Sequence, residues 1–265
     1  MRIDLHNHTT FCNHATGSMQ EYVQKAIEKG IDTFGFSEHA PMPFDEKYRL
    51  KLEDKSTYES NVLALQKEYA KDITILLGYE VDFLPKYMLD EVLNSPVDYL
   101  IGSVHFLQKK DTTDLWGFDN PEFIGGYENV DIDTIWQDYF DTIEAMAKSK
   151  LFDIVGHMDL IKVFKFLPKK DVRFIAKKAL LAIKKANMSI ELNAAGIRKP
   201  IAEPYPSKAL LEEAYALDIP ITFGSDAHEI EQVGFSYEIV KEIALSIGYT
   251  KCATYKNRER ELVTF

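Results

Sequence analysis

Short apolar runs alternate with longer amphipathic segments along nearly the whole chain. Runs of this length, rich in β-branched residues, are typical of buried strands. They occupy residues 2–6, 33–39, 74–83, 99–106, 153–158, 189–196, 221–228 and a weaker 252–255. The clearest helical patterns between them cover residues 18–30, 132–150, 169–187 and 206–219. Because strands that alternate with helices form parallel βαβ units, the pattern predicts a (β/α) barrel.

The segment 107–130 interrupts this alternation. It is long and turn-rich, and it carries Trp116, Phe118 and Phe123. In a barrel, an insertion after a strand lies over the active face as a lid or substrate loop, although a surface loop with its own aromatic cluster fits the pattern equally well. No linker rich in Pro, Gly or Ser divides the chain, so we expect a single domain over 1–265 with 107–130 as a loop insertion over the active face.

Composition and charge narrow the classes of function. Hydrophobic residues make up 46% of the chain and charged residues 28%, which suits a packed core and argues against disorder. The net charge of −11 disfavours a nucleic-acid partner. A phosphorylated small molecule remains compatible with this charge if metal cations or a few placed basic groups receive it.

The chain shows no sign of export or of a membrane segment. No apolar leader precedes the first strand, and no apolar run approaches the ~20 residues of a membrane span. Cys12 and Cys252 form no paired motif, which suits a reducing compartment, and we expect a cytoplasmic protein. Cys12 lies among the early histidines, so a thiolate ligand and a free thiol both stay open.

All seven histidines fall at, or just past, the carboxyl ends of predicted strands, where catalytic groups gather in a parallel barrel. His6 and His8 are two residues apart on one strand and therefore face the same side. Asp226 and His228 repeat this spacing, and Glu80 supplies a carboxylate from a strand of its own. The remaining imidazoles belong to His14, His39, His105 and His157.

A single histidine at a strand end is more often a hydrogen-bonded rim residue than a ligand. Seven imidazoles on one face would repel one another on protonation, and metal ions remove that difficulty. Nine ligands exceed the need of one ion, so we expect two or three ions of zinc, iron or manganese with Glu80 as a bridge. Closely spaced ions clamp oxyanions and supply a bridging hydroxide, as phosphoester hydrolysis requires.

The successive motifs DLHNHTTFCNH, GFSEHAPMP, GYEVDF, GSVHF, GHMDL and GSDAH resemble those of the PHP (polymerase and histidinol phosphatase) superfamily. The match runs in order from the first strand to at least Gly234. SVHF and ELNAAGIRKPIAEPYPS make the chain more similar to the PHP-type histidinol-phosphate phosphatases of histidine biosynthesis than to PHP domains in general.

This resemblance implies a distorted (β/α)7 barrel with a trinuclear metal centre. By position, the first ion would be held by His6, His8, Glu80 and Asp226. The second ion would be held by Glu80, His105 and His157. The third ion would be held by His14, His39 and His228. All nine matched positions carry a competent ligand.

The resemblance also implies an activity, the hydrolysis of L-histidinol phosphate to L-histidinol and phosphate. A metal-bridging hydroxide would attack phosphorus. We expect Arg198 to bind the phosphoryl group and His39 to contact the substrate as well as a metal. The family pattern calls for an arginine where this chain has Lys162, which keeps the charge but lacks the bidentate geometry. Asp226 or His228 would protonate the leaving alkoxide.

Further residues are candidates for supporting roles. Glu38 and Asp159 flank ligands and either orient an imidazole or face solvent. Asp119, Glu122 and Phe118 are candidates for recognising the ammonium and imidazole of the substrate. The sequence gives no indication of the oligomeric state.

Alternative functions differ mainly in substrate. A PHP phosphoesterase could act on another small phosphomonoester, a nucleotide or phosphotyrosine. A non-catalytic metal-binding regulatory module is disfavoured because all nine ligands are intact. Metallo-β-lactamase and amidohydrolase sites fit less well, since the former continues its first His pair differently and the latter bridges its ions with a lysine.

Overall fold

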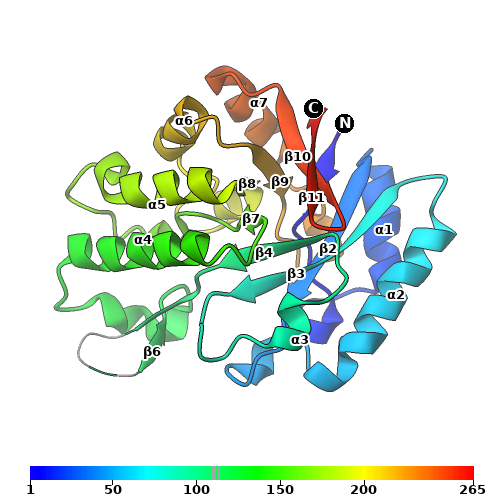
Figure 1. Cartoon of the computed structure of the whole chain (residues 1–265), viewed down its shortest axis with the longest axis horizontal. Coiled ribbons are helices and arrows are strands. Elements are labelled where there is room, and N and C mark those ends of the chain that lie inside the picture. Colours follow the sequence, from blue (N-terminus) through cyan, green and yellow to red (C-terminus); the bar gives the residue numbers. More distant parts are fainter. Residues whose placement is uncertain (109–111, 113) are drawn as a thin grey trace.

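Seven parallel strands form the centre of the molecule (Figure 1). The structure, a computed structural model, describes residues 1–108, 112 and 114–265. Across the sheet the strands are β1 (Ile3–Asp4), β2 (Thr33–His39), β3 (Thr74–Asp82), β4 (Tyr99–Ser103), β7 (Ile154–Val155), β8 (Ser189–Asn193) and β9 (Ile221–Gly224). The edge strands β1 and β9 meet, because Leu5 N donates to Phe223 O at 2.9 Å and Asn7 bridges to Ala227. The sheet is therefore a nearly closed barrel, and the expected (β/α)7 architecture is confirmed.

Helices lie outside this barrel (Figure 1). They are α1 (Met19–Glu28), α2 (Lys55–Glu68), α3 (Asp90–Leu93), α4 (Ile132–Ser149), α5 (Val172–Ala186), α6 (Lys208–Ala216) and α7 (Tyr237–Ile247). A capping box between Ser18 and Glu21 begins α1, and Gly30 follows its end with φ +67°. Among the described helices, none is both long and apolar enough to cross a membrane.

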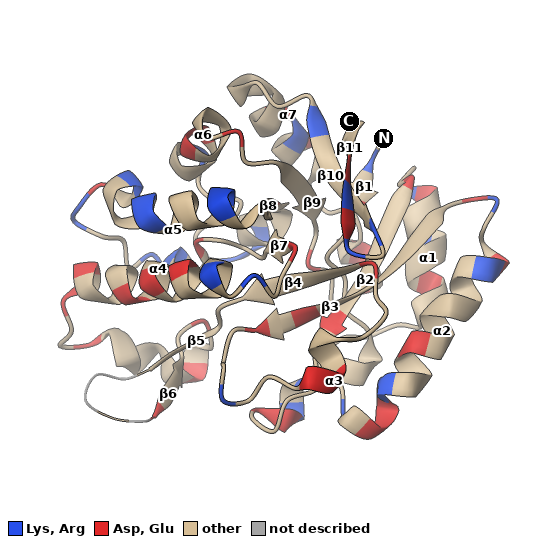
Figure 2. Cartoon of the chain, viewed as in Figure 1, with Lys and Arg blue, Asp and Glu red and all other residues tan. Residues whose placement is uncertain are grey.

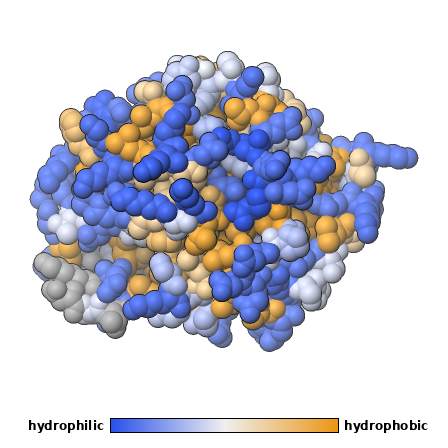
Figure 3. Space-filling view, in the orientation of Figure 1, coloured by the Kyte–Doolittle hydropathy of each residue, from blue (hydrophilic) through white to orange (hydrophobic). Residues whose placement is uncertain are grey.

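Charges of both signs cover these helices. Acidic residues dominate α4 and basic residues dominate the neighbouring α5 (Figure 2). In the same orientation the surface is mainly hydrophilic, with apolar groups gathered in separate places between polar ones (Figure 3). On this face the basic residues of α5 thus lie beside the acidic residues of α4 (Figure 2).

The β10–β11 hairpin (Lys251–Lys256 and Glu259–Thr264) covers the amino-terminal end of the barrel. Thr222 Oγ1 donates to Ala253 O at 2.9 Å, and Tyr255 OH donates to Ser189 Oγ at 2.7 Å. The opposite end of the barrel, where the strands finish, is left for the loops that carry the histidines.

Strand alternation decides which side chains enter the barrel. Tyr79 in β3 belongs to the core shared with the helices, whereas Leu76 packs inside the barrel. Glu80 and Asp82 follow Leu76 at even spacing and therefore face the interior at the carboxyl end of β3. Tyr99 fills the interior below them, and its hydroxyl donates to Leu5 O at 2.7 Å.

The segment after β4 forms a small antiparallel hairpin of β5 (Phe106–Gln108) and β6 (Leu115–Gly117), followed by the 3₁₀ helix η4 (Pro121–Tyr127). Part of the expected insertion, residues 109–111 and 113, lies outside the described residues. Phe118 is fully buried, and its carbonyl accepts a hydrogen bond from Tyr127 at 3.2 Å. Phe118 therefore belongs to the core, which corrects the suggestion that it recognises substrate.

Candidate metal centre

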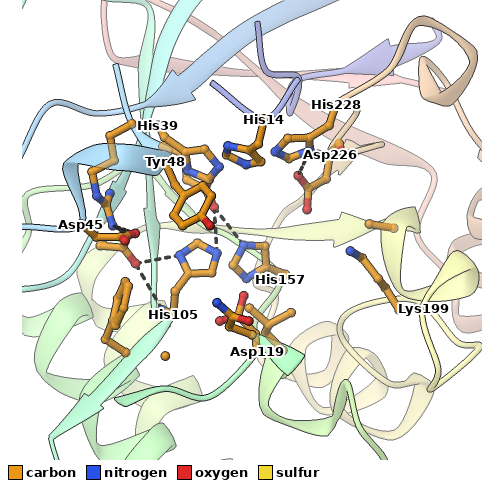
Figure 4. A pocket seen from close by; sticks show the side chains of 18 of the residues that line it. His14, His39, Asp45, Tyr48, His105, Asp119, His157, Lys199, Asp226 and His228 are labelled. Atoms are coloured by element: carbon orange, nitrogen blue, oxygen red, sulfur yellow. Dashed lines mark hydrogen bonds and ion pairs between the residues drawn. The ribbon is translucent and has the colours of Figure 1, made fainter. Parts of the chain in front are cut away.

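The seven imidazoles converge at the carboxyl ends of the barrel strands. Figure 4 shows the five that line the cavity. They come from loops far apart in the sequence, because parallel strands bring their ends to one rim. His6 and His8 follow β1 and are fully buried at the floor of the site. The other five line a cavity of about 710 Å³, and they are His14, His39, His105, His157 and His228.

Glu80 lies at the centre of the cluster. Its Oε2 is 2.9 Å from His39 Nδ1 and 3.4 Å from His6 Nε2. Its Oε1 is 2.9 Å from His157 Nε2 and 3.7 Å from His105 Nε2. The two oxygens thus face different imidazoles, which is the geometry of a carboxylate that bridges two ions.

Two of the three expected ligand sets lie together as expected. The ligand atoms of His6, His8 and Glu80 are within 4.8 Å of one another, and so are those of Glu80, His105 and His157. Asp226 Oδ1 lies 3.3 Å from His8 Nε2, so it faces the first set.

The third set is arranged differently from the expectation. His39 and His228 lie with His8 rather than with His14 as a group within 4.8 Å. His14 forms a group with His228 and the thiol of Cys12 instead. Burial raises the pKa of that thiol, which disfavours the thiolate in the metal-free protein.

Whether a metal ion fits this site can be judged from its buried polar atoms. His6 Nε2, His8 Nε2 and Glu80 Oε2 are buried close together, and neither imidazole nitrogen has a hydrogen-bond partner among the described residues. Leaving such atoms unpaired is costly, and a cation between them would satisfy all three. Imidazole and carboxylate donors suit zinc, iron or manganese. The residues present therefore fit a multinuclear metal centre.

The electrostatics of the cluster are those of a site built for positive charge. Burial by itself would lower the pKa of His8, but the neighbouring carboxylates of Asp226 and Glu38 outweigh it and raise that pKa to about 9. Burial is likewise outweighed at His105, where the charges of Asp82 and Glu80 raise the pKa to about 10. Neighbouring imidazoles hold the pKa of Glu80 well below its usual range despite its burial.

Three further carboxylates orient the imidazoles. Glu191 accepts from His6 Nδ1 at 2.7 Å and from the backbone N–H of His157 at 2.8 Å. Asp82 accepts from His105 Nδ1 at 2.7 Å. Glu38 lies 3.4 Å from His8 Nδ1, so the orienting role considered for it is the one the geometry supports.

Glu191 and Asp82 were not identified from the sequence. The signal for Asp82 is its spacing of two residues from Glu80 on one strand, which places both on the same face. The signal for Glu191 is a carboxylate in an otherwise apolar strand, since such a group is almost never buried without a partner.

Arg198 lines the cavity and also holds the backbone beneath Asp226. Its Nη1 donates to Ser225 O at 2.8 Å and its Nη2 to Asp226 O at 2.5 Å. Asp226 has φ +53°, a left-handed conformation that these two hydrogen bonds stabilise. Lys199, which sequence reasoning did not single out, is exposed and points into the cavity beside Asp226 (Figure 4).

Lys162 does not reach the cavity. It is 1% exposed, and its Nζ donates to Pro204 O at 2.8 Å and pairs with Glu203 at 2.8 Å and Asp159 at 3.0 Å. Three acceptors therefore engage the three ammonium hydrogens, so the geometry does not support a phosphate contact. Asp159 also accepts from Ser207 N at 2.8 Å and orients no imidazole.

Comparisons with known proteins agree with this fold. The PHP domain model matches residues 4–195, and a PHP-associated model matches residues 211–245. A Deinococcus radiodurans protein assigned as a histidinol-phosphatase is 40% identical over 264 residues, covering 97% of this chain and 98% of the relative. The histidinol-phosphatase of Bacillus subtilis is 31% identical and covers 90% of this chain and 98% of the relative.

A solved structure shares the fold. Histidinol phosphate phosphatase from Lactococcus lactis, in complex with zinc, L-histidinol and phosphate, superposes with a TM-score of 0.74 at 20% identity, covering 98% of each chain. The family models and the two sequence relatives show that this chain belongs to the PHP domain family, within its histidinol-phosphatase branch.

Proposed function

We propose that this protein hydrolyses L-histidinol phosphate to L-histidinol and phosphate, a step of histidine biosynthesis. The observation that carries the proposal is the clustering of seven imidazoles with Glu80 and Asp226, five of the imidazoles lining one cavity. The choice of substrate rests on the histidinol-phosphatases of Deinococcus radiodurans and Bacillus subtilis, which align with nearly the whole chain. The Lactococcus lactis protein binds zinc, L-histidinol and phosphate, which is consistent with this substrate.

The cofactors in this proposal are two to three divalent ions, with zinc as the first candidate because the Lactococcus lactis protein binds it. His6, His8, Glu80 and Asp226 would hold one ion. Glu80, His105 and His157 would hold another, and His39 and His228 with either His8 or His14 a third. When bound, such ions neutralise phosphate charge and lower the pKa of water so that hydroxide is available at neutral pH.

Residues of the cavity would bind and orient the phosphoryl group. Arg198 uses two of its five N–H groups on the backbone, and the remaining ones are the expected phosphate donors. Lys199 adds a second positive charge on the same side (Figure 4). His39 is in part exposed to the cavity, in line with a substrate contact besides metal binding.

Proton transfer to the leaving oxygen stays a prediction for Asp226 or His228. Nearby imidazoles outweigh burial and hold the pKa of Asp226 well below its usual range. Burial lowers the pKa of His228. Neither group holds a proton readily at neutral pH in the metal-free protein, which favours their roles as ligands over a role as proton donor.

We further infer that residues 1–265 act as a single metallohydrolase domain whose segment 107–130 forms part of the active face. In support, Asp119, Glu122 and Phe123 from this segment line the cavity. We also infer a cytoplasmic location, because Cys12 and Cys252 are both free and buried.

The test is phosphate release from L-histidinol phosphate, measured beside AMP, an aryl phosphate and a phosphotyrosine peptide on protein of known metal content. We expect kcat/KM for L-histidinol phosphate to exceed the others by ~100-fold, about 2.7 kcal/mol in transition-state binding. Comparable rates on all four would leave a phosphoesterase of other specificity. No turnover by fully metallated protein would contradict the catalytic function.

A further inference from the structure

The cavity has two chemically different sides. Arg198 and Lys199 lie on one side, next to Asp226. Asp45 lies on the opposite side from Lys199, and Asp119 lies on the wall away from His14 and His228 (Figure 4). Basic groups therefore border the metal cluster at one end, and carboxylates border it at the other.

The acidic side continues into an aromatic recess. A second cavity of about 450 Å³ shares five lining residues with the first, namely Asp45, Phe106, Gly117, Glu122 and Phe123. Phe44 and Trp116 add to its walls. Phe44 packs edge-to-face on Phe106 with ring centroids 5.0 Å apart, so the recess presents aromatic faces and edges beside carboxylates.

Basic side chains near this end are already engaged. Arg49 Nη2 pairs with Asp82 at 2.6 Å and lies 3.7 Å from Asp45. Lys47 Nζ donates to Tyr48 OH at 2.9 Å and lies over the ring of that residue. Lys47 keeps its positive charge, but the carboxylates of Asp45, Asp119 and Glu122 outnumber it on this side of the cavity.

Asp119 is a half-buried carboxylate on the wall of this cavity. No other described side chain pairs with it or donates a hydrogen bond to it. Burial raises the pKa of Asp119. The nearest opposite charges are those that His105 and His157 would carry, and metal binding requires both imidazoles to be neutral.

We propose that Asp119, with Asp45 at the cavity edge and the aromatic faces of Phe106 and Phe123, binds an organic cation on the leaving alcohol of the substrate. A protonated amine would pair with Asp119, and a planar ring would pack on the aromatic faces. The inference rests on the proposed function and names the residues that select its substrate. A zwitterionic phosphomonoester would then bind in one orientation, with phosphate toward Arg198 and its cation toward Asp119.

The first experiment measures KM and kcat of Asp119→Asn with three phosphomonoesters. L-histidinol phosphate and O-phosphoethanolamine carry a cation, and glycerol 3-phosphate does not. We expect KM for both cationic substrates to rise about 10- to 100-fold, as for loss of a charge-assisted hydrogen bond. KM for glycerol 3-phosphate should change less than about twofold, because the variant leaves the phosphate end intact.

The second experiment does not depend on catalysis. Calorimetry would measure binding of L-histidinol, which has the cation but no phosphate, to the wild type and to Asp119→Asn. We expect the variant to bind about 10- to 100-fold more weakly. Glu128→Gln is the matched control, since Glu128 is an exposed carboxylate of the same segment that does not line the cavity. Thermal melting verifies that both variants fold.

The outcomes separate this inference from the proposed function. Equal effects of Asp119→Asn on all three substrates, or equal wild-type kcat/KM for cationic and neutral esters, would overturn the inference while leaving the phosphatase function in place. Turnover of none of the esters by metallated wild type would overturn the function. In that case unchanged L-histidinol binding in Asp119→Asn would overturn the inference too, and weakened binding would support it.

Discussion

Glu191 joins two parts of the metal centre through a single buried carboxylate. One oxygen accepts from His6 Nδ1 and the other from the backbone of His157. It fixes the tautomer that leaves His6 Nε2 facing the site. We expect Glu191→Gln to lower the affinity for zinc about 10- to 100-fold, measured by competition with a chromogenic chelator.

Two further variants make this prediction specific. Gly224→Ala should weaken zinc binding in the same direction, because a Cβ there would overlap Glu191 Oε1 and approach His6 Cβ at 2.7 Å. Glu242→Gln, at an exposed position on α7, should leave zinc affinity unchanged. If Glu191→Gln retained wild-type affinity, Glu191 would not orient His6.

The ion pair between Asp82 and Arg49 is buried on both sides, each residue being 3% exposed. We expect Asp82→Asn to lower the free energy of unfolding of the metal-free protein by about 3–5 kcal/mol, because Arg49 then stays buried without its partner. The double variant Asp82→Asn, Arg49→Met should lose less. Urea titration measures both, and equal losses in the single and double variants would contradict the prediction.

Among the secondary-structure elements, β2, β3 and β4 meet around one side chain. Tyr99 of β4 crosses the barrel interior, and glycines occupy the neighbouring strands where it passes. A Cβ on Gly35 would overlap the Tyr99 hydroxyl, and one on Gly78 would approach its ring at 2.7 Å. Glycine is needed at both positions because the strands leave no room for a methyl group beside the ring.

This packing predicts the effect of small substitutions. Gly78→Ala should lower the free energy of unfolding by about 1–3 kcal/mol, as overpacking does. Adding Tyr99→Leu should recover part of that loss by freeing space. Gly125→Ala is the control, because nothing lies within 4 Å of its added Cβ. If the two glycine variants lost equal stability in urea titration, close packing against Tyr99 would not be the cause.

Most strands and helices could be predicted from the periodicity of apolar residues, but the positions of their ends could not. The strand prediction 153–158 contracts to β7 at Ile154–Val155, and 221–228 contracts to β9 at Ile221–Gly224. These strands end earlier than predicted because the chain leaves the sheet before the residues that we propose as metal ligands. Helices α2 and α7 were not singled out, although Tyr58, Val62 and Leu65 are buried at helical spacing on α2.

For the molecule as a whole, metal binding is coupled to protons. The pKa of His8 is raised to about 9 and that of His105 to about 10, so the metal-free protein holds protons there at pH 7. A raised folded-state pKa contributes stability below the ordinary value near 6.5, and that contribution is lost as the pH rises through about 9. Ion binding must displace the same protons.

We therefore expect zinc affinity to increase with pH until about 9–10, where His8 and His105 have lost their protons. Calorimetry at pH 7 in two buffers of different ionisation enthalpy should give a net release of about two protons in all, one each from His8 and His105. Zinc binding without proton release would show that these imidazoles are neutral before the ion arrives.

The sequence by itself determined the order of the strands, the barrel class and the nine residues that we propose as metal ligands. These follow from local periodicity and from one topological fact, since parallel strands joined by helices bring their carboxyl ends to one rim. Only the tertiary structure decided which side chains form hydrogen bonds with the proposed ligands. Glu191 meets His6 across 185 positions of sequence. Lys162 turns to Asp159, Glu203 and Pro204 instead of the cavity, because the direction of a side chain depends on long-range packing that no local pattern encodes.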